Sequence, residues 1–214
     1  MRISKLEPSQ RVKGRWLVWL DDGSLLRVSE NEVVFFSLSA GMELSDETLA
    51  ELTAAAGASA LRDKALGLIS VRPMSRRELM QKLTARPRDR EKQPMATPEL
   101  AGEVADWLEN LGLLNDAEYG KTVVRHYSAK GYGERKLRDE LFRRGVPRDL
   151  WDAALEEAQP PESGVDAFLR SRLKGAAPDA RELKRVSDAL ARRGYRWEEI
   201  REGLRRYGAE LEEE

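Results

Sequence analysis

The sequence predicts a mainly α-helical protein: tandem three-helix repeats, helix-turn-helix-like, behind a small N-terminal β-hairpin-plus-helix module. One observation is that a helix, a basic stop and a second helix recur 49 residues apart, as LRDELFRRGVPRDLWDAAL at 137–155 and VSDALARRGYRWEEIREGL at 186–204. A second is that apolar residues alternate with a period of two only near the start, at 15–28, as they do in strands. A third is that apolar residues from about residue 45 onwards recur at helical spacing.

Residues 1–58 are expected to form the N-terminal module. The segment RWLVWL at 15–20 alternates its apolar residues and leads into an Asp22–Gly23 turn and a second apolar run, which is a β-hairpin pattern. A short third strand around Ile3 is a weaker expectation. Ser45 is placed to cap the helix that follows.

The rest of the chain predicts three repeats of helix, break, helix, break and helix. We expect the helices at 61–72, 75–85 and 98–111, then at 116–129, 134–144 and 148–157, and finally at 164–174, 179–193 and 197–207. The corresponding domains are 59–114 (with a polar, proline-rich loop at 85–98), 115–160 and 161–208, followed by an acidic tail at 209–214. Because one such unit buries little apolar surface alone, neighbouring repeats are expected to stack.

The composition argues against an enzyme. The chain has no cysteine, which excludes disulfides, thiolate nucleophiles and cysteine-based metal sites. Its single histidine, His126, has no neighbours that would complete a catalytic or zinc-binding set. We therefore expect no catalytic residues, no metal and no cofactor. The start lacks the apolar run of a signal peptide, and no stretch approaches the roughly 20 apolar residues of a membrane helix, so we expect a cytoplasmic protein.

Three segments resemble the RecX family, the regulators of the RecA recombinase. They are RPMSRREL followed by QKL (72–83), LGLLNDAEYG (111–120) and KGYGERKLRDELFRRGVPRDLWDAAL (130–155). ARRGYRWEEI in the third repeat fits the same pattern, so the resemblance covers about residues 60–207. The hairpin VWLDDGSLLRV is similar to an extra module of longer members. The chain departs from the family in the long loop at 85–98 and in Tyr119–Gly120, where Phe-Ala is more usual.

The resemblance implies an elongated, curved helical protein that lies in the groove of the RecA–single-stranded DNA filament. Such proteins modulate ATP hydrolysis, strand exchange and co-protease activity of RecA, and so act in homologous recombination, DNA repair and the SOS response. Most members inhibit RecA, although the sign differs between members. The implied partners are the RecA filament and single-stranded DNA, reached through RecA or directly. We expect a monomer that does not bind membranes.

Positive charge is concentrated in the second and third repeats, although the net charge of the chain is only −1. Nine basic residues face three acidic ones between 121 and 148, and twelve face six between 170 and 206. Positive charge spread over many residues favours binding to closely spaced phosphates. The candidates for filament or DNA contact are Arg125, Lys130, Arg135, Lys136, Arg143, Arg144, Arg192 and Arg193.

The two Arg-Arg-Gly stops also have a purely structural explanation. Cations in the last turn of a helix complement its dipole by about 0.3–1 kcal/mol, and a following glycine is a usual left-handed stop. The two roles are compatible, and arginine in all four places, where lysine would cap as well, favours a contact role. An alternative for the whole protein is a stand-alone DNA-binding or architectural protein. That alternative predicts that the protein binds naked DNA without RecA, and that this binding weakens steeply as the salt concentration rises.

Overall fold

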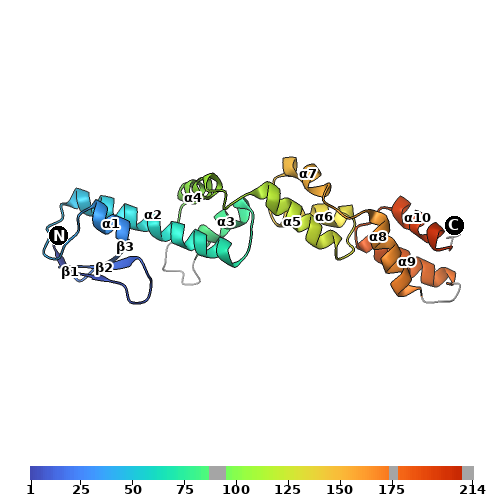
Figure 1. Ribbon diagram of the computed structural model, residues 1–214, viewed down its shortest axis with the longest axis horizontal. Coiled ribbons are helices and arrows are strands. Elements are labelled where there is room, and N and C mark those ends of the chain that lie inside the picture. Colours follow the sequence, from blue (N-terminus) through green and yellow to red (C-terminus); the bar gives the residue numbers. More distant parts are fainter. Residues whose placement is uncertain (87–94, 174–177, 209–214) are drawn as a thin grey trace. The chain divides into compact units, whose positions relative to one another are not determined.

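The computed structural model describes residues 1–86, 95–173 and 178–208 (Figure 1). They form two compact units: unit 1 contains Met1–Arg72 and Leu79–Leu108, and unit 2 contains Pro73–Glu78 and Glu109–Glu214. The acidic tail at 209–214 and most of the loop predicted at 85–98 lie outside the described residues. The fold is mainly helical behind a small sheet, as the sequence predicts.

Unit 1 begins with a three-stranded antiparallel sheet in the order β1 (Ile3–Pro8), β2 (Arg15–Leu20) and β3 (Leu25–Ser29), which confirms the hairpin and the third strand. One face of the sheet packs on a helix to form the core of this unit. The fully buried members of that core include Ile3, Val18, Val28 and Leu52. The alternation along β2 therefore places every second residue in the core, as period-two patterning requires.

The short helix α1 (Glu30–Phe35) is an element that the sequence analysis missed. Its start is a capping box, in which Ser29 accepts a hydrogen bond from the Glu32 amide while the Glu32 carboxylate accepts one from the Ser29 amide. The Ser-x-x-Glu spacing of this box is visible in the sequence and was the signal for the helix.

Helix α2 (Asp46–Val71) is one continuous helix of 26 residues, so the expected separation into two helices near residue 60 is wrong. Ser45 caps it as predicted, accepting a hydrogen bond from the Thr48 amide at 3.1 Å. The segment around Gly57 is rich in alanine and leucine, and a single internal glycine costs only about 1 kcal/mol relative to alanine, which is too little to end a well-packed helix. The boundary proposed after residue 58 lies inside α2.

Two further helices follow α2, namely α3 (Arg76–Leu83) and α4 (Pro98–Asn110). Within unit 1 the guanidinium of Arg62, on the second half of α2, lies 5.4 Å from the centre of the Trp107 ring on α4. The second half of α2 therefore contacts α4 at Arg62, and the first half packs its apolar residues on the sheet.

Unit 2 contains the second and third repeats, each with its own core. The second repeat has α5 (Asp116–Ser128), α6 (Glu134–Arg143), a 3-10 turn η1 (Arg148–Leu150) and α7 (Trp151–Leu155). The third has α8 (Pro161–Arg172), α9 (Ala180–Arg192) and α10 (Trp197–Tyr207). Helix α8 starts three residues earlier than predicted, because Pro161 occupies the first helical position that proline favours.

Candidate interface at the repeat junctions

The same contact joins successive repeats twice within unit 2. At the first junction, between 73–78 and 143–146, the hydroxyl of Ser75 donates a hydrogen bond to the carbonyl oxygen of Arg144 at 2.5 Å. At the second, between 130–136 and 192–196, the amide of Gly133 donates to the carbonyl oxygen of Arg193 at 2.9 Å. Ser75 and Gly133 each stand just before the middle helix of their repeat. The Arg-Arg-Gly stop of one repeat thus binds the start of the middle helix of the repeat before it.

The glycines of the two stops are favoured by their backbone conformation and by the small space at the junctions. Gly145 and Gly194 have φ of 73° and 91°, which confirms the predicted left-handed stops. A Cβ on Gly145 would lie 2.7 Å from Cδ of Arg77, and one on Gly194 would overlap the backbone nitrogen of Lys136. A Cβ on Gly133 would lie 2.6 Å from the carbonyl of Gly194. Close backbone approach therefore excludes a side chain at Gly133 and Gly194, and the positive φ disfavours one at Gly145 and Gly194.

The second arginine of the first stop, Arg144, is half-buried and held by contacts within unit 2. Arg144 donates to the hydroxyls of Tyr119 at 2.9 Å and Tyr127 at 3.1 Å, and its guanidinium lies 5.5 Å from the centre of the Tyr127 ring. Burial by itself would lower the pKa of this guanidinium, but the hydrogen bonds to Tyr127 and Tyr119 outweigh burial and hold the pKa above its usual value. Arg144 remains charged and serves the fold.

Arg193, the second arginine of the other stop, has the same kind of role. Its Nη1 donates to the carbonyl oxygens of Lys130 and Gly131, both at 3.2 Å. Its guanidinium lies 4.7 Å from the centre of the Phe168 ring and 5.7 Å from that of Tyr132. It therefore ties the turn before α6 to the third repeat.

The first arginine of each stop faces solvent instead. The Arg143 side chain is 68% exposed and pairs with Glu140 at 2.9 Å. Arg192 is exposed and makes no side-chain hydrogen bond or ion pair within the described part of the chain. Neighbouring residues of a helix differ by about 100° in direction, so one arginine of each pair is available to a ligand while the other packs.

Several other candidate cations also gather at the junctions. The second junction brings the exposed Lys130 and Arg135 and the half-buried Lys136 to the same turn as Arg192 and Arg193. Lys136 lies 3.8 Å from the carboxylate of Glu140. That carboxylate, only 5% exposed, is also the partner of Arg143 and lies 3.9 Å from Arg144. One buried negative charge therefore anchors three cations, and the local charge stays positive.

Two cations of the first junction were missed in the sequence. Arg76 and Arg77 open α3, where the Arg77 side chain lies against Gly145. The likeness between SRREL at 75–79 and GERKL at 133–137 was the available signal. The predicted candidate Arg125 makes an ion pair with Glu157 at 3.1 Å and a hydrogen bond to Thr122 at 3.2 Å. Its side chain is 51% exposed, and it stays a predicted contact.

This arrangement can bind anions, and it offers no set of groups for covalent chemistry. No group of three or more potential metal ligands occurs among the described residues. No helix in the described ranges is long and apolar enough to cross a membrane. The features that recur are exposed arginines and lysines held at fixed positions beside rigid glycine turns.

Comparison with known proteins agrees with the repeat pattern. Residues 115–155 match a family model described as the second three-helix domain of RecX. A protein named regulatory protein RecX from Halorhodospira halophila is 33% identical over 150 residues, which cover 69% of this chain and 88% of the relative. One with the same name from Streptococcus gordonii is 24% identical over 217 residues, covering all of this chain and 80% of the relative. A crystal structure of a regulatory protein RecX matches with a TM-score of 0.66 at 23% identity, covering 94% of this chain and 98% of that one.

Proposed function

This chain belongs to the RecX family of regulatory proteins, which are not enzymes, and we propose that it regulates the RecA recombinase by binding the RecA–single-stranded DNA filament through the cations at its repeat junctions. The observation that carries the proposal is the recurrence of one junction, with exposed cations beside it each time. In this proposal, the DNA repair and SOS roles of the protein follow from its action on RecA.

The repetition supports a filament as the partner. A filament presents the same protomer surface at regular intervals, so a ligand with regularly repeated contacts gains from each of them. The Arg-Arg-Gly stop recurs after 49 residues in the sequence, and its contact with the preceding repeat recurs in the fold. Arg143 and Arg192 would then make equivalent contacts with successive protomers or with the phosphates that they enclose.

The kind of charge also supports this partner. DNA phosphates are densely spaced, and neutralising them with arginine or lysine supplies much of the affinity of nucleic-acid-binding proteins. The exposed cations of the second junction, Lys130, Arg135 and Arg192, have no side-chain ion pair within the described part of the chain. They would break no ion pair on binding. Arg143 would keep Glu140 beside it, which orients its guanidinium.

We propose inhibition as the mode of regulation. A rigid ligand lodged in the filament groove bridges protomers and opposes the changes that accompany ATP hydrolysis, or it blocks extension at a filament end. The protein would act as a monomer in the cytoplasm. Contact with single-stranded DNA would occur within the filament, where phosphates and protomer surfaces lie together.

The test is DNA-dependent ATP hydrolysis by the cognate RecA, with this protein titrated well below one per RecA protomer. We expect hydrolysis to fall at such ratios. Replacing Arg143 and Arg192 by Glu should weaken the effect by on the order of tenfold for each arginine, or about 1.4 kcal/mol per contact. The matched control replaces Arg170 and Arg205, two exposed arginines of unit 2 outside the junctions, and should act like the natural chain.

Two results would contradict the proposal. If the junction variant and the control lose activity equally, overall charge rather than the junctions determines binding. If inhibition appears only when DNA is limiting and excess DNA relieves it, the protein competes for DNA and the stand-alone DNA-binding alternative is the better description. Gel-shift assays with and without RecA over a range of salt concentrations distinguish that case, because naked-DNA binding falls steeply with salt.

A further inference from the structure

The sheet of unit 1 has a second apolar face that its core does not use. The core takes Val18 and Leu20 from β2, whereas Leu17 and Trp19 point to the other face and are only half-buried. Leu25 on β3 shares that face, because it pairs with Trp19. An antiparallel sheet with one covered face normally presents polar residues on the other. A strand that is apolar on both faces is typical of a sheet whose second face is also covered.

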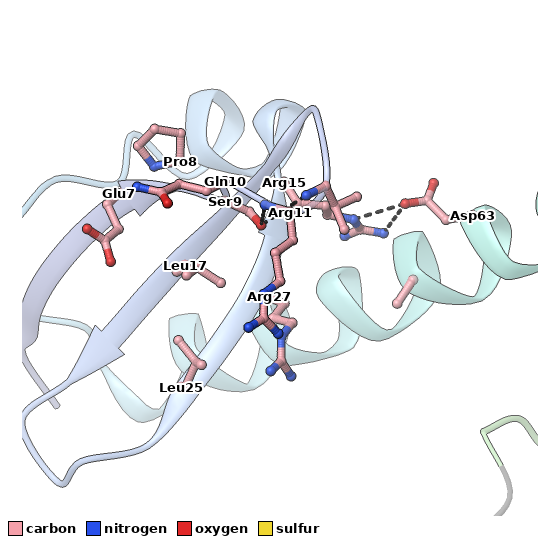
Figure 2. Close-up of a pocket in the computed structure, with 12 residues that line it drawn as sticks. Glu7, Pro8, Ser9, Gln10, Arg11, Arg15, Leu17, Leu25, Arg27 and Asp63 are labelled. Atoms are coloured by element: carbon pink, nitrogen blue, oxygen red, sulfur yellow. Dashed lines mark hydrogen bonds and ion pairs between the residues drawn. The ribbon is translucent and has the colours of Figure 1, made fainter.

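This second face forms the floor of a groove of about 640 Å³ (Figure 2). The volume lies within the roughly 300–1,000 Å³ of typical ligand sites. The strands, the loop between β1 and β2, and α2 all contribute to its walls. The lining residues that matter here are Arg11, Arg15, Leu17, Leu25, Arg27 and Asp63.

The walls of the groove are fixed in place by buried polar contacts. Arg15, only 9% exposed, donates to the Asp63 carboxylate at 2.9 and 2.6 Å and to the Ser59 hydroxyl at 2.8 Å. These bonds join the start of β2 to α2, as Figure 2 shows for Arg15 and Asp63. The loop is held by the Ser9 hydroxyl, which accepts hydrogen bonds from the amides of Arg11 and Val12, both at 3.3 Å. The groove is therefore formed without a ligand.

The charge available in the groove is positive. The carboxylate of Asp63 is neutralised by Arg15, and that of Glu7 pairs with Lys5 at 2.7 Å. Arg11 and Arg27 are exposed, and within the described ranges their guanidiniums make no ion pair or hydrogen bond. Two unpaired guanidiniums thus stand beside a leucine floor.

We propose that this groove binds an extended segment of a partner protein in which an apolar and an acidic residue stand two positions apart. The spacing follows from β3, where Leu25 and Arg27 lie two residues apart on the same face, about 6.6 Å along the strand. An extended peptide has the same period, so its apolar side chain meets the leucines while its carboxylate meets a guanidinium. The planar guanidinium binds a carboxylate through two parallel hydrogen bonds.

The floor favours a peptide over single-stranded nucleic acid. Proteins that bind single strands stack the bases on aromatic side chains, whereas the apolar lining residues of this groove are aliphatic. The site belongs to unit 1, whereas the cations to which we assign filament binding belong to unit 2, so it is an additional interaction surface.

The test measures the fluorescence anisotropy of a dye-labelled peptide, Thr-Leu-Thr-Glu-Thr-Leu-Thr-Glu-Thr, titrated with the full chain. We expect saturable binding and no binding of the same peptide with lysine in place of glutamate. Replacing Arg11 and Arg27 by Glu should weaken binding at least about tenfold. The control replaces Lys13 and Lys64, exposed residues of unit 1 outside the groove, by Glu and should bind like the natural chain. Far-ultraviolet circular dichroism checks that both variants are folded.

Three outcomes would overturn the proposal: no saturable binding of the glutamate peptide up to millimolar concentration, equal weakening in the control, or stronger binding of a labelled oligothymidylate that the Arg11 and Arg27 substitutions abolish. The last would assign the groove to nucleic acid. The Arg11 and Arg27 variant is expected to regulate RecA ATP hydrolysis as the natural chain does. The outcome here is therefore separate from that of the junction experiment.

Discussion

The hydroxyl of Ser75 binds the carbonyl oxygen of Arg144, 69 residues further along the chain. The amide of Gly133 does the same for Arg193 one repeat later. Within unit 2, both contacts join a helix start to an Arg-Arg-Gly stop further along the chain. A motif that looks like two cations and a stop is therefore a junction whose first arginine remains exposed to a ligand.

Because Gly194 lies close to the backbone of Lys136, adding even a methyl group there should strongly lower the free energy of unfolding. Replacing Gly194 by Ala should destabilise the protein by about 1–2 kcal/mol for the left-handed backbone and by about 1–3 kcal/mol more for overpacking against Lys136. Gly208 is the matched control, because its φ is 81° and nothing lies within 4 Å of its added Cβ. Urea unfolding of both variants measures the difference, and equal losses would mean that the junction tolerates a methyl group.

Ser75 has two roles, and a comparison with Ser45 separates them. Each hydroxyl caps a helix by accepting a hydrogen bond at 3.1 Å, from Glu78 and Thr48 respectively. Only Ser75 also donates across a junction. We expect Ser45→Ala to cost about 1 kcal/mol, and Ser75→Ala to cost about 1–3 kcal/mol more because the Arg144 carbonyl loses its donor. Thermal unfolding compares them, and a Ser75 variant no less stable than the Ser45 variant would show that the junction bond adds nothing.

The two arginines of the first stop should differ in how much stability their substitution by lysine costs. Lysine cannot reproduce the fork by which Arg144 binds two tyrosine hydroxyls, so Arg144→Lys should cost about 1–3 kcal/mol. Arg143→Lys keeps an exposed cation near Glu140 and should change stability by less than about 0.5 kcal/mol. Chemical denaturation tests this pair. A larger loss for Arg143→Lys would reverse our assignment of which arginine supports the fold.

The raised pKa of the Asp116 carboxyl predicts an unusual pH dependence of the free energy of unfolding. Its carboxylate accepts the Arg76 amide at 2.7 Å, but burial dominates and raises the pKa of the carboxyl above its ordinary value. In the window between the ordinary and the raised pKa, the folded chain holds a proton that the unfolded chain has released. The contribution of Asp116 to stability therefore falls as the pH rises through that window. Asp116→Asn, which retains an oxygen acceptor, should remove that fall.

Glu118 is the control for this prediction, since its pKa is shifted the other way. Its hydrogen bond and charge interaction with Lys121 lower the pKa of the carboxyl. Its stabilising contribution should be lost as the pH falls, so Glu118→Gln should reduce acid sensitivity. Unfolding free energies of the natural chain and both variants, measured from acid to neutral pH, check the two signs. The prediction for Asp116 fails if its variant also mainly reduces acid sensitivity.

Local sequence patterns predicted most of the fold, because most of its elements are determined by residues close together in the sequence. The hairpin, the cap at Ser45 and the left-handed glycines depend on residues within a few positions, and all are present. The continuity of α2 was not predicted, since a glycine among strong helix formers does not reveal whether packing on both sides will hold it. The different fates of Arg143 and Arg144 depend on tyrosines 17 and 25 residues away, which no local pattern reports.

Helix α2 fixes the rotation about its own axis between the sheet and α4. It spans about 39 Å at 1.5 Å per residue and packs its first half on the sheet and its second half on α4. Arg62 and Asp63 are neighbours on α2, about 100° apart about the helix axis, and they contact Trp107 of α4 and Arg15 of β2 respectively. The direction from which a partner must approach the N-terminal groove, relative to α4, is therefore set by the spacing of contact residues along α2.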